Sequence, residues 1–250
     1  CLKCQSIIFK NIGIGTQKVE REINSLFPQA ITARLDSQTT KKTGYLEKIY
    51  FDFSQGKIDI LIGTQMITKG WDLPKMALIG IIDGDNVFAF PDFYAEEKAF
   101  QQIFQLSGRI SRPGAKFPGI VVIQTFHPES SFFQTIKENN SVKFYQKQLE
   151  ERKNLFYPPF STLIKLIFQD KSLAKAAKET NRVYKIIKEK SGKINQVSEP
   201  TDCFIPKIRG RFRKQIIIKS KNPQIQPSIE RILKTLTRGW IIDRDPISII

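Results

Sequence analysis

Short apolar segments alternate, along the first 150 residues, with stretches in which apolar side chains recur at helical spacing. The strand-like segments are residues 31–35, 58–63, 77–82 and 119–125, and the helix-like ones are residues 16–26, 46–53, 93–109 and 131–149. The strand-like segments are nearly continuous in Ile, Val and Leu, as in strands buried on both faces. This alternation predicts an α/β fold with a parallel sheet covered by helices. Thr16 is the expected N-cap of the first helix, which Pro28 ends.

A different pattern follows Tyr157-Pro158-Pro159-Phe160, where two prolines force an extended backbone and remove two amide donors. Beyond this strap we expect strand, helix, strand, strand, helix and strand at residues 162–168, 173–190, 194–197, 214–219, 227–236 and 240–243. This β-α-β-β-α-β order is that of a smaller, ferredoxin-like α+β domain. The sequence thus predicts domains at residues 5–150 and 162–250, joined by a linker at 151–161.

The positive charge is concentrated in the second domain. Of 40 basic and 24 acidic side chains, residues 1–150 hold 18 and 15, whereas residues 151–250 hold 22 and 9. A block this basic favours a polyanionic partner, either nucleic acid or an anionic membrane surface. A lysine-rich solvated surface is the alternative. No apolar run approaches the roughly 18 residues that cross a bilayer.

The cysteines and the first residue bear on the context of the chain. Cys1, Cys4 and Cys203 are too few for a disulfide framework, which predicts a reducing, cytoplasmic location. No basic-then-apolar leader opens the chain, so we expect no secretion. Because the chain starts at Cys1 without an initiator Met, we interpret it as a fragment of a longer protein.

The most specific motif is Gln105-Leu106-Ser107-Gly108-Arg109-Ile110-Ser111-Arg112, at the end of an expected helix. Two arginines three residues apart project from one side of a helical turn. Their planar guanidinium groups can clamp γ-phosphate oxygens during phosphoryl transfer, and the preceding glycine allows close approach of the backbone to a nucleotide. An ordinary amphipathic helix with cations in its last turn is the alternative.

A second motif, Gly63-Thr64-Gln65-Met66-Ile67-Thr68-Lys69-Gly70-Trp71-Asp72, directly follows an apolar segment. A strand that runs into such a loop places amides and hydroxyls at the carboxyl edge of a parallel sheet, where these folds bind ligands. Thr64, Thr68 and Lys69 can grip a nucleic-acid backbone, and Asp72 can accept a hydrogen bond from a ribose hydroxyl. A plain surface loop is the alternative.

The two motifs together resemble motifs V and VI in the second RecA-like lobe of superfamily 2 helicases. The string G-T-Q-M-I-x-K-G-x-D, followed by D-G-D, P-D-F and Q-x-x-G-R, is similar to that of the primosomal replication-restart DNA helicases, the PriA (primosomal protein N′) family. Cys1-Leu2-Lys3-Cys4 precedes Gly13-Ile14-Gly15-Thr16 as the last zinc-binding cysteine pair precedes the G-x-G-T motif of that family. The strap and residues 208–213 also resemble its C-terminal region.

The resemblance implies roles for individual residues and implies ATP, Mg²⁺ and Zn²⁺ as cofactors. Arg109 and Arg112 would reach ATP bound mainly by a first lobe, while Gln105 would help to couple nucleotide to DNA. The remaining implied contacts are Gly63, Asp72 and Gly108 with the nucleotide, Thr64, Thr68 and Lys69 with the translocated strand, and Cys1 and Cys4 as half of a four-thiolate zinc site. A redox pair or a coincidental spacing is the alternative for an isolated C-x-x-C.

The chain departs from the family pattern at two places. Family members more often have G-R-A-G-R, whereas this chain has Ile110 and Ser111, and we expect the bulk of Ile110 to alter how tightly two lobes close. Trp71 stands where histidine is commoner, so a role of that imidazole does not transfer. The chain has no G-x-x-x-x-G-K-[ST] phosphate cradle and no D-E-x-H box, so we expect ATP hydrolysis only together with an upstream lobe.

Seven cations and no acid lie between residues 207 and 221, namely Lys207, Arg209, Arg211, Arg213, Lys214, Lys219 and Lys221, with Phe212 among them. Such a run neutralises phosphates and predicts salt-dependent, sequence-independent binding, and the aromatic ring can stack on an unpaired base. Arg209, Arg211 and Arg213 are expected on one face of a strand. A solvated edge strand that its charge keeps from aggregating is the alternative.

Several other residues are expected to be structural. His127 fits a turn better than a catalytic base, and Cys203 fits a small packed side chain. Asp83 and Asp85, at a strand end, fit turn caps better than a metal site. The aromatic residues Phe88, Phe90, Phe93 and Tyr94 fit core or lobe-interface packing better than contact with DNA bases.

The sequence therefore predicts the C-terminal part of an ATP-dependent 3′→5′ DNA helicase that restarts stalled replication forks by primosome assembly. By resemblance, its partners are forked and single-stranded DNA, single-strand-binding protein and other primosome proteins, in a bacterial cytoplasm at the nucleoid and not at a membrane. Two alternatives remain: another superfamily 2 nucleic-acid helicase, and a non-catalytic nucleic-acid-binding module.

Overall fold

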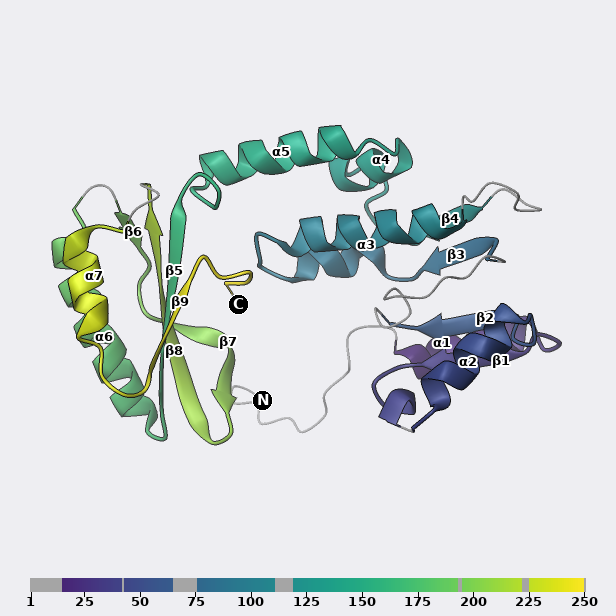
Figure 1. Cartoon of the computed structure of the whole chain (residues 1–250), viewed down its shortest axis with the longest axis horizontal. Coiled ribbons are helices and arrows are strands. Elements are labelled where there is room, and N and C mark those ends of the chain that lie inside the picture. The colour runs from purple at the N-terminus through teal and green to yellow at the C-terminus, as the bar shows by residue number, and fades with distance from the viewer. Residues whose placement is uncertain are drawn as a thin grey trace. The chain divides into compact units, whose positions relative to one another are not determined.

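The computed structural model describes residues 15–41, 43–64, 76–110, 119–192, 195–221 and 225–249, without the side chains of residues 41, 109 and 195. By contact the chain divides into two compact units (Figure 1). The first comprises residues 1–87 and 98–136, and the second comprises residues 88–97 and 137–250. The domain boundaries expected at residues 150 and 162 stay a prediction of the sequence, although the contacts group residues 137–161 with the second unit.

The first unit begins with a β-α-β arrangement that brings two strands together in parallel. Its helices are α1 (Thr16–Leu26) and α2 (Tyr45–Ser54), its strands are β1 (Thr32–Leu35) and β2 (Ile60–Gly63), and a 3-10 turn η1 (Thr39–Lys41) follows β1. The strands pair from Thr32 opposite Ile60 to Leu35 opposite Gly63. Ala33, Leu35, Ile49 and Ile58 form a small core between strands and helices.

A second parallel pair completes the described strands of this unit. Strand β3 (Leu78–Ile81) pairs with β4 (Ile120–Ile123), and helices α3 (Ala95–Ile110) and α4 (Ser131–Lys137) and the 3-10 turn η3 (Gly84–Ala89) surround them in the sequence. The predicted parallel pairing is confirmed. In the described ranges, however, the strands form two separate pairs, and Leu78, Ile120 and Val122 are exposed rather than covered on both faces.

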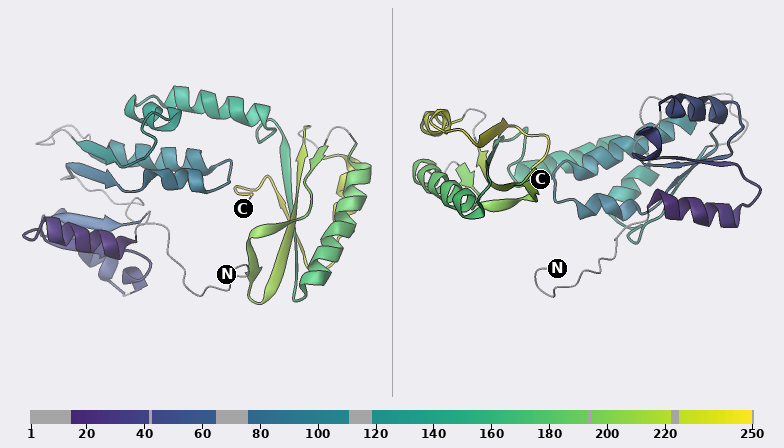
Figure 2. Two further views of the ribbon diagram at one scale, coloured as in Figure 1. Left: turned by 180° about the vertical axis from the view of Figure 1, so that it is seen from behind. Right: turned by 90° about the horizontal axis from the view of Figure 1, so that it is seen from below.

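The second unit is built on one antiparallel sheet. Its elements are β5 (Thr162–Asp170), α6 (Leu173–Lys190), β6 (Asn195–Val197), β7 (Thr201–Ile208), β8 (Arg211–Ser220), α7 (Pro227–Lys234) and β9 (Trp240–Arg244). The strand order is β6-β8-β5-β9, and β7 pairs with β8. Helices α6 and α7 cover one face (Figures 1 and 2), where Ile164, Leu166, Val183, Ile216 and Ile218 form the core.

The other face of this sheet buries a lysine on its central strand. Leu163, Lys165 and Ile167 are buried there, and the chain after β9 crosses them: the Leu163 amide donates to the Asp245 carboxylate at 2.9 Å, and Lys165 Nζ donates to the Ser248 carbonyl at 3.3 Å. Burial lowers the pKa of Lys165, because the charged form loses its hydration.

Three expectations about the elements are wrong. The helix expected at residues 131–149 is divided into α4 and α5 (Ser141–Asn154), because Asn139 has a positive φ of 52° and the Asn140 side chain accepts from the Lys143 amide as the N-cap of α5. Strand β7 was not expected at all. Thr16 is also not an N-cap: it is the first residue of α1, and its hydroxyl donates to Asp36 at 2.8 Å.

The aromatic segment before α3 packs into the second unit through Arg152. Its guanidinium pairs with Glu97 and lies over the Tyr94 ring at 4.3 Å and the Phe93 ring at 5.5 Å. Phe93 stacks on Tyr157 of the strap, with ring centroids 4.5 Å apart. The packing expected for Phe93 and Tyr94 is therefore confirmed. Among the helices of the described ranges, none combines the length and apolarity of a membrane-spanning helix.

Candidate nucleic-acid interface

The parallel pair β1–β2 brings two loops to one edge of the first unit. Leu35 lies opposite Gly63, so Asp36 and Thr64 leave the sheet side by side at its carboxyl edge, where parallel sheets bind ligands. Gly63 and Thr64 are both exposed at this edge. The rest of that predicted motif, Thr68, Lys69 and Asp72, lies outside the described residues.

Asp36, which the sequence analysis did not single out, organises this edge. Its carboxylate accepts from the Gln38 amide at 2.9 Å, the Thr39 amide at 3.0 Å and the Thr16 hydroxyl at 2.8 Å, and it forms an ion pair with Arg34. These bonds, that from Thr39 first, lower the pKa of Asp36 from 3.8 to about 2. An Asp after a strand, followed by Ser, Gln and Thr, is the local signal of such a turn.

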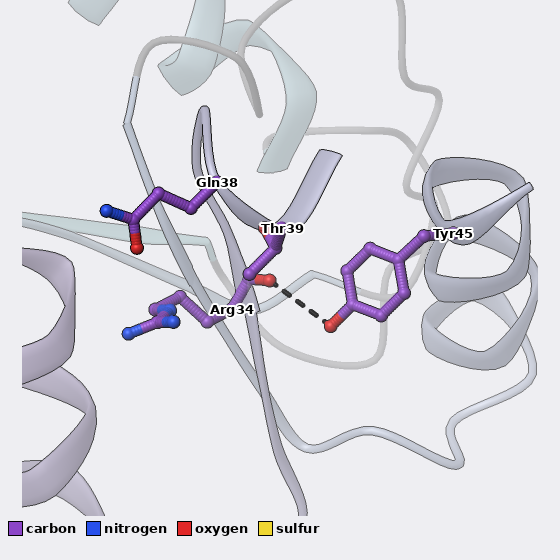
Figure 3. A pocket seen from close by; sticks show the side chains of 4 residues that line it. All are labelled: Arg34, Gln38, Thr39 and Tyr45. Atoms are coloured by element: carbon purple, nitrogen blue, oxygen red, sulfur yellow. Dashed lines mark hydrogen bonds between the residues drawn. The ribbon is translucent and has the colours of Figure 1, made fainter. Parts of the chain in front are cut away.

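A shallow pocket of about 250 Å³ opens beside this network (Figure 3). It is lined by Arg34, Gln38, Thr39 and Tyr45, and the Tyr45 hydroxyl donates to the Arg34 carbonyl at 3.4 Å. The guanidinium of Arg34 also pairs with Glu20 at 3.3 Å. The carboxylates of Glu20 and Asp36 balance the charge of Arg34. Arg34 therefore stabilises this edge of the sheet and does not attract an anion strongly.

The C-terminal end of α3 carries the described part of the arginine motif. Gln105 and Gly108 are exposed, and a Cβ at Gly108 would meet no atom within 4 Å, so the helix surface is open there. Arg109 is the next-to-last residue of α3, but its side chain and the whole of Arg112 lie outside the described residues. Ile110 is buried, so its bulk is taken up inside this unit.

The loop after β3 is closed by the two acids that follow this strand. Asp85 accepts from the Thr125 hydroxyl at 2.7 Å and the Phe126 amide at 2.8 Å, and Asp83 accepts from Asn86 at 2.8 Å. The bond from Phe126 lowers the pKa of Asp85. The expected turn-capping role is confirmed. In the parts of the chain that the structure describes, no three His, Cys, Asp or Glu side chains come together as a metal site requires, and Cys1 and Cys4 lie outside those parts.

The basic stretch of the second unit forms a hairpin of β7 and β8. Arg209 and Gly210 join the strands, with φ of 48° and 76°, and Ile208 pairs with Arg211. The expectation that Arg209 shares a strand face with Arg211 and Arg213 is therefore wrong. A two-residue hairpin turn needs positive φ at both central positions, which takes Arg209 out of the strand and to the exposed tip of the hairpin.

The seven cations differ in what they contact. Lys207, Arg209 and Arg211 are exposed, with Lys207 Nζ 4.6 Å from the Phe212 ring. Lys214 pairs with Asp202 at 2.9 Å, an acid that the fold brings in from β7. Lys219 lies 3.6 Å from the Tyr157 ring and donates to the Leu155 carbonyl at 3.0 Å, and burial lowers its pKa. The cations at the hairpin tip are thus the ones open to a polyanion.

Two family models match successive parts of this chain. Residues 4–114 match the family model of the helicase conserved C-terminal domain, and residues 153–247 match that of the primosomal protein N C-terminal domain. The replication restart protein PriA of Bacillus subtilis is 36% identical over 239 residues, which are 95% of this chain and 29% of that protein. The chain belongs to the PriA family.

Further members of the PriA family show the same extent of likeness. The replication restart protein PriA of Chlamydia pneumoniae is 38% identical over 254 residues, covering 99% of this chain and 34% of that protein. That of Borreliella burgdorferi is 33% identical over 257 residues, covering 100% and 38%. The chain thus spans about a third of the length of these curated relatives. The two matched domains, in this order, fit the C-terminal part of a replication-restart helicase.

Proposed function

We propose that this chain is the C-terminal part of an ATP-dependent 3′→5′ DNA helicase that restarts stalled replication forks by assembling a primosome. The observation that carries the proposal is the ordered match of both domains over nearly the whole chain to replication restart proteins. In this proposal residues 5–150 are the second RecA-like lobe, and residues 162–250 are a ferredoxin-like DNA-binding domain. The antiparallel strand order β6-β8-β5-β9, with α6 and α7 on one face, supports the second assignment.

The lobe contributes residues to a nucleotide site that an upstream lobe completes. Arg109 and Arg112 reach the γ-phosphate of ATP and stabilise the charge that develops in phosphoryl transfer, and Gln105 couples this site to DNA. Gly63, Asp72 and Gly108 face the nucleotide. Mg²⁺ neutralises phosphate charge when ATP is bound. Cys1 and Cys4 supply two thiolates of a four-thiolate Zn²⁺ site.

The nucleic-acid contacts in this proposal come from both units. Thr64, which is exposed at the end of β2, holds the backbone of the translocated strand together with Thr68 and Lys69. The exposed cations of the hairpin add phosphate contacts without base specificity. The partners are forked and single-stranded DNA, single-strand-binding protein and primosome proteins, at the nucleoid of a bacterial cytoplasm.

The hairpin contacts are tested by the salt dependence of binding to labelled single-stranded DNA. Replacing Lys207, Arg209 and Arg211 by Gln removes three exposed cations, so the slope of log affinity against log salt should fall by about 2. The matched control replaces Lys185, Lys188 and Lys190 of α6, exposed cations of the same unit, and should leave the slope nearly unchanged. Equal slopes for the two triple variants would contradict the assignment of the hairpin.

A further inference from the structure

Strand β7 carries a wide irregularity in the middle of the basic hairpin. Asp202 pairs with Lys214, and Lys207 pairs with Phe212, so residues 203–206 of β7 lie opposite Arg213 alone. Pro206, within this bulge, has no amide to donate. A bulge turns side chains away from the alternation of a regular strand. Here Cys203 is buried, whereas Phe204 and Ile205 are 56% and 53% exposed.

The exposed ring of Phe204 lies beside a second exposed ring. Phe90, from the segment before α3 that belongs to the same unit, is 51% exposed. The two ring centroids are 6.2 Å apart and the ring planes are inclined by 47°. Two half-exposed phenyl rings from distant parts of the sequence thus present free faces together. Two adjacent exposed rings are a small apolar surface that a ligand with a flat apolar face could cover.

The charges around these rings indicate which ligand they fit. Arg213, opposite the bulge, reaches the Ile205 carbonyl with Nη1 at 3.4 Å. The same strands carry the exposed cations Lys207 and Arg211, while the nearby Asp202 is paired with Lys214. Asp170 of β5 partly balances the charge of Arg211, and Lys207 and Arg211 stay exposed. Aromatic faces next to exposed cations are the arrangement by which proteins hold single-stranded nucleic acid: bases stack on the rings and phosphates contact the cations.

We propose that Phe90 and Phe204 form a stacking site for unpaired bases of a single strand whose backbone runs along Lys207, Arg211 and Arg213. This inference rests on the proposed nucleic-acid contacts of the hairpin and adds the element that distinguishes unpaired from paired DNA. The cations attract any DNA, whereas bases reach the rings only in a single strand.

The experiment compares three ligands of equal length: oligothymidine, the same strand with abasic sites, and duplex DNA. The variant Phe90→Leu/Phe204→Leu keeps apolar side chains and removes the aromatic faces. Its affinity for oligothymidine should fall about 5- to 50-fold, as expected for lost base stacking, with little change for the abasic strand or the duplex. Phe90→Tyr/Phe204→Tyr should restore binding because tyrosine keeps the ring face.

Two further readouts separate this proposal from that for the hairpin. The variant Phe90→Leu/Phe204→Leu should keep the wild-type dependence of affinity on salt, because it removes no phosphate contact. The control variant Phe126→Leu, at an exposed phenylalanine of the other unit, should bind oligothymidine as the wild type does. A normal salt slope with unchanged oligothymidine affinity overturns the stacking site alone. An equal loss on all three ligands overturns it as well.

Discussion

Asp36, at the carboxyl end of β1, shows how one short side chain can fix the conformation of a turn. The carboxylate of Asp36 accepts hydrogen bonds from two backbone amides and from the Thr16 hydroxyl of α1, and it forms an ion pair with the guanidinium of Arg34. Each donor is one that would otherwise need water. The turn that leaves β1 is therefore held in one conformation beside Gly63 and Thr64, the edge at which we propose contacts with a strand of nucleic acid.

Asp36→Asn should lower the stability of the first unit at neutral pH, and this difference should vanish in acid. The folded-state pKa of about 2 lies below the ordinary value of 3.8, so the ionised carboxylate stabilises the fold above about pH 4. That contribution is lost as the pH falls toward 2. Urea unfolding of wild type and variant from pH 7 to pH 2.5 measures the difference.

Glu47→Gln, at an exposed carboxylate in the first turn of α2, is the control for the loss of one negative charge. A stability difference between wild type and Asp36→Asn that stays constant down to pH 2.5 would show that Asp36 acts through its shape and not through its charge.

The end of α3 and the start of β4 are in close contact. A Cβ built on Gly119 would lie 2.6 Å from both the carbonyl oxygen and the Cβ of Ile110, a separation that real contacts do not reach. The last residue of α3, the helix that carries Gln105 and Arg109, thus packs directly against Gly119, the residue before β4. The sequence departure at Ile110 and the close approach at Gly119 are parts of one contact.

Gly119→Ala should destabilise the first unit by about 1–3 kcal/mol, the usual cost of overpacking, because a backbone oxygen cannot move aside as a side chain can. Gly80→Ala in β3, where a Cβ would meet nothing within 4 Å, should cost far less. Thermal unfolding compares the two variants, and equal melting temperatures would mean that the helix end shifts freely.

Strand β7 shows why one element escaped prediction. Its sequence, Thr201-Asp202-Cys203-Phe204-Ile205-Pro206-Lys207-Ile208, contains a proline and no regular alternation. Such a segment fits an edge strand with a bulge, where a missing amide costs no ladder bond. Only the pairing with β8 makes it a strand, and the same bulge exposes Phe204.

At the scale of the whole molecule, the sequence contains the two arginines of the proposed nucleotide site but no phosphate cradle of the G-x-x-x-x-G-K-[ST] kind. The 250 residues should therefore release no phosphate from ATP above background, with or without single-stranded DNA. In a chain extended upstream to the length of its relatives, DNA-stimulated hydrolysis should appear. There Arg109→Ala should lower kcat by about 10³-fold or more.

Lys98→Ala in the extended chain, at an exposed residue on the first half of α3, is the control for a lost cation on the same helix and should hydrolyse ATP as the unchanged protein does. Hydrolysis by the 250 residues alone, stimulated by DNA, would contradict the division of the nucleotide site between two lobes.

The sequence by itself determined what depends on neighbours along the chain: most of the helices and strands, the two motifs, the turn acids Asp83 and Asp85, and the family. Periodicity and motif spacing are local properties, so they can be read without coordinates. Only the tertiary structure decided the hydrogen bonds of Asp36 and the contacts of Arg152 with Phe93, Tyr94 and Glu97. It also decided the position of Arg209 in a turn and the contact between the rings of Phe90 and Phe204. These join residues far apart in sequence or depend on strand register, and register follows from the packing of the whole unit and not from any one segment.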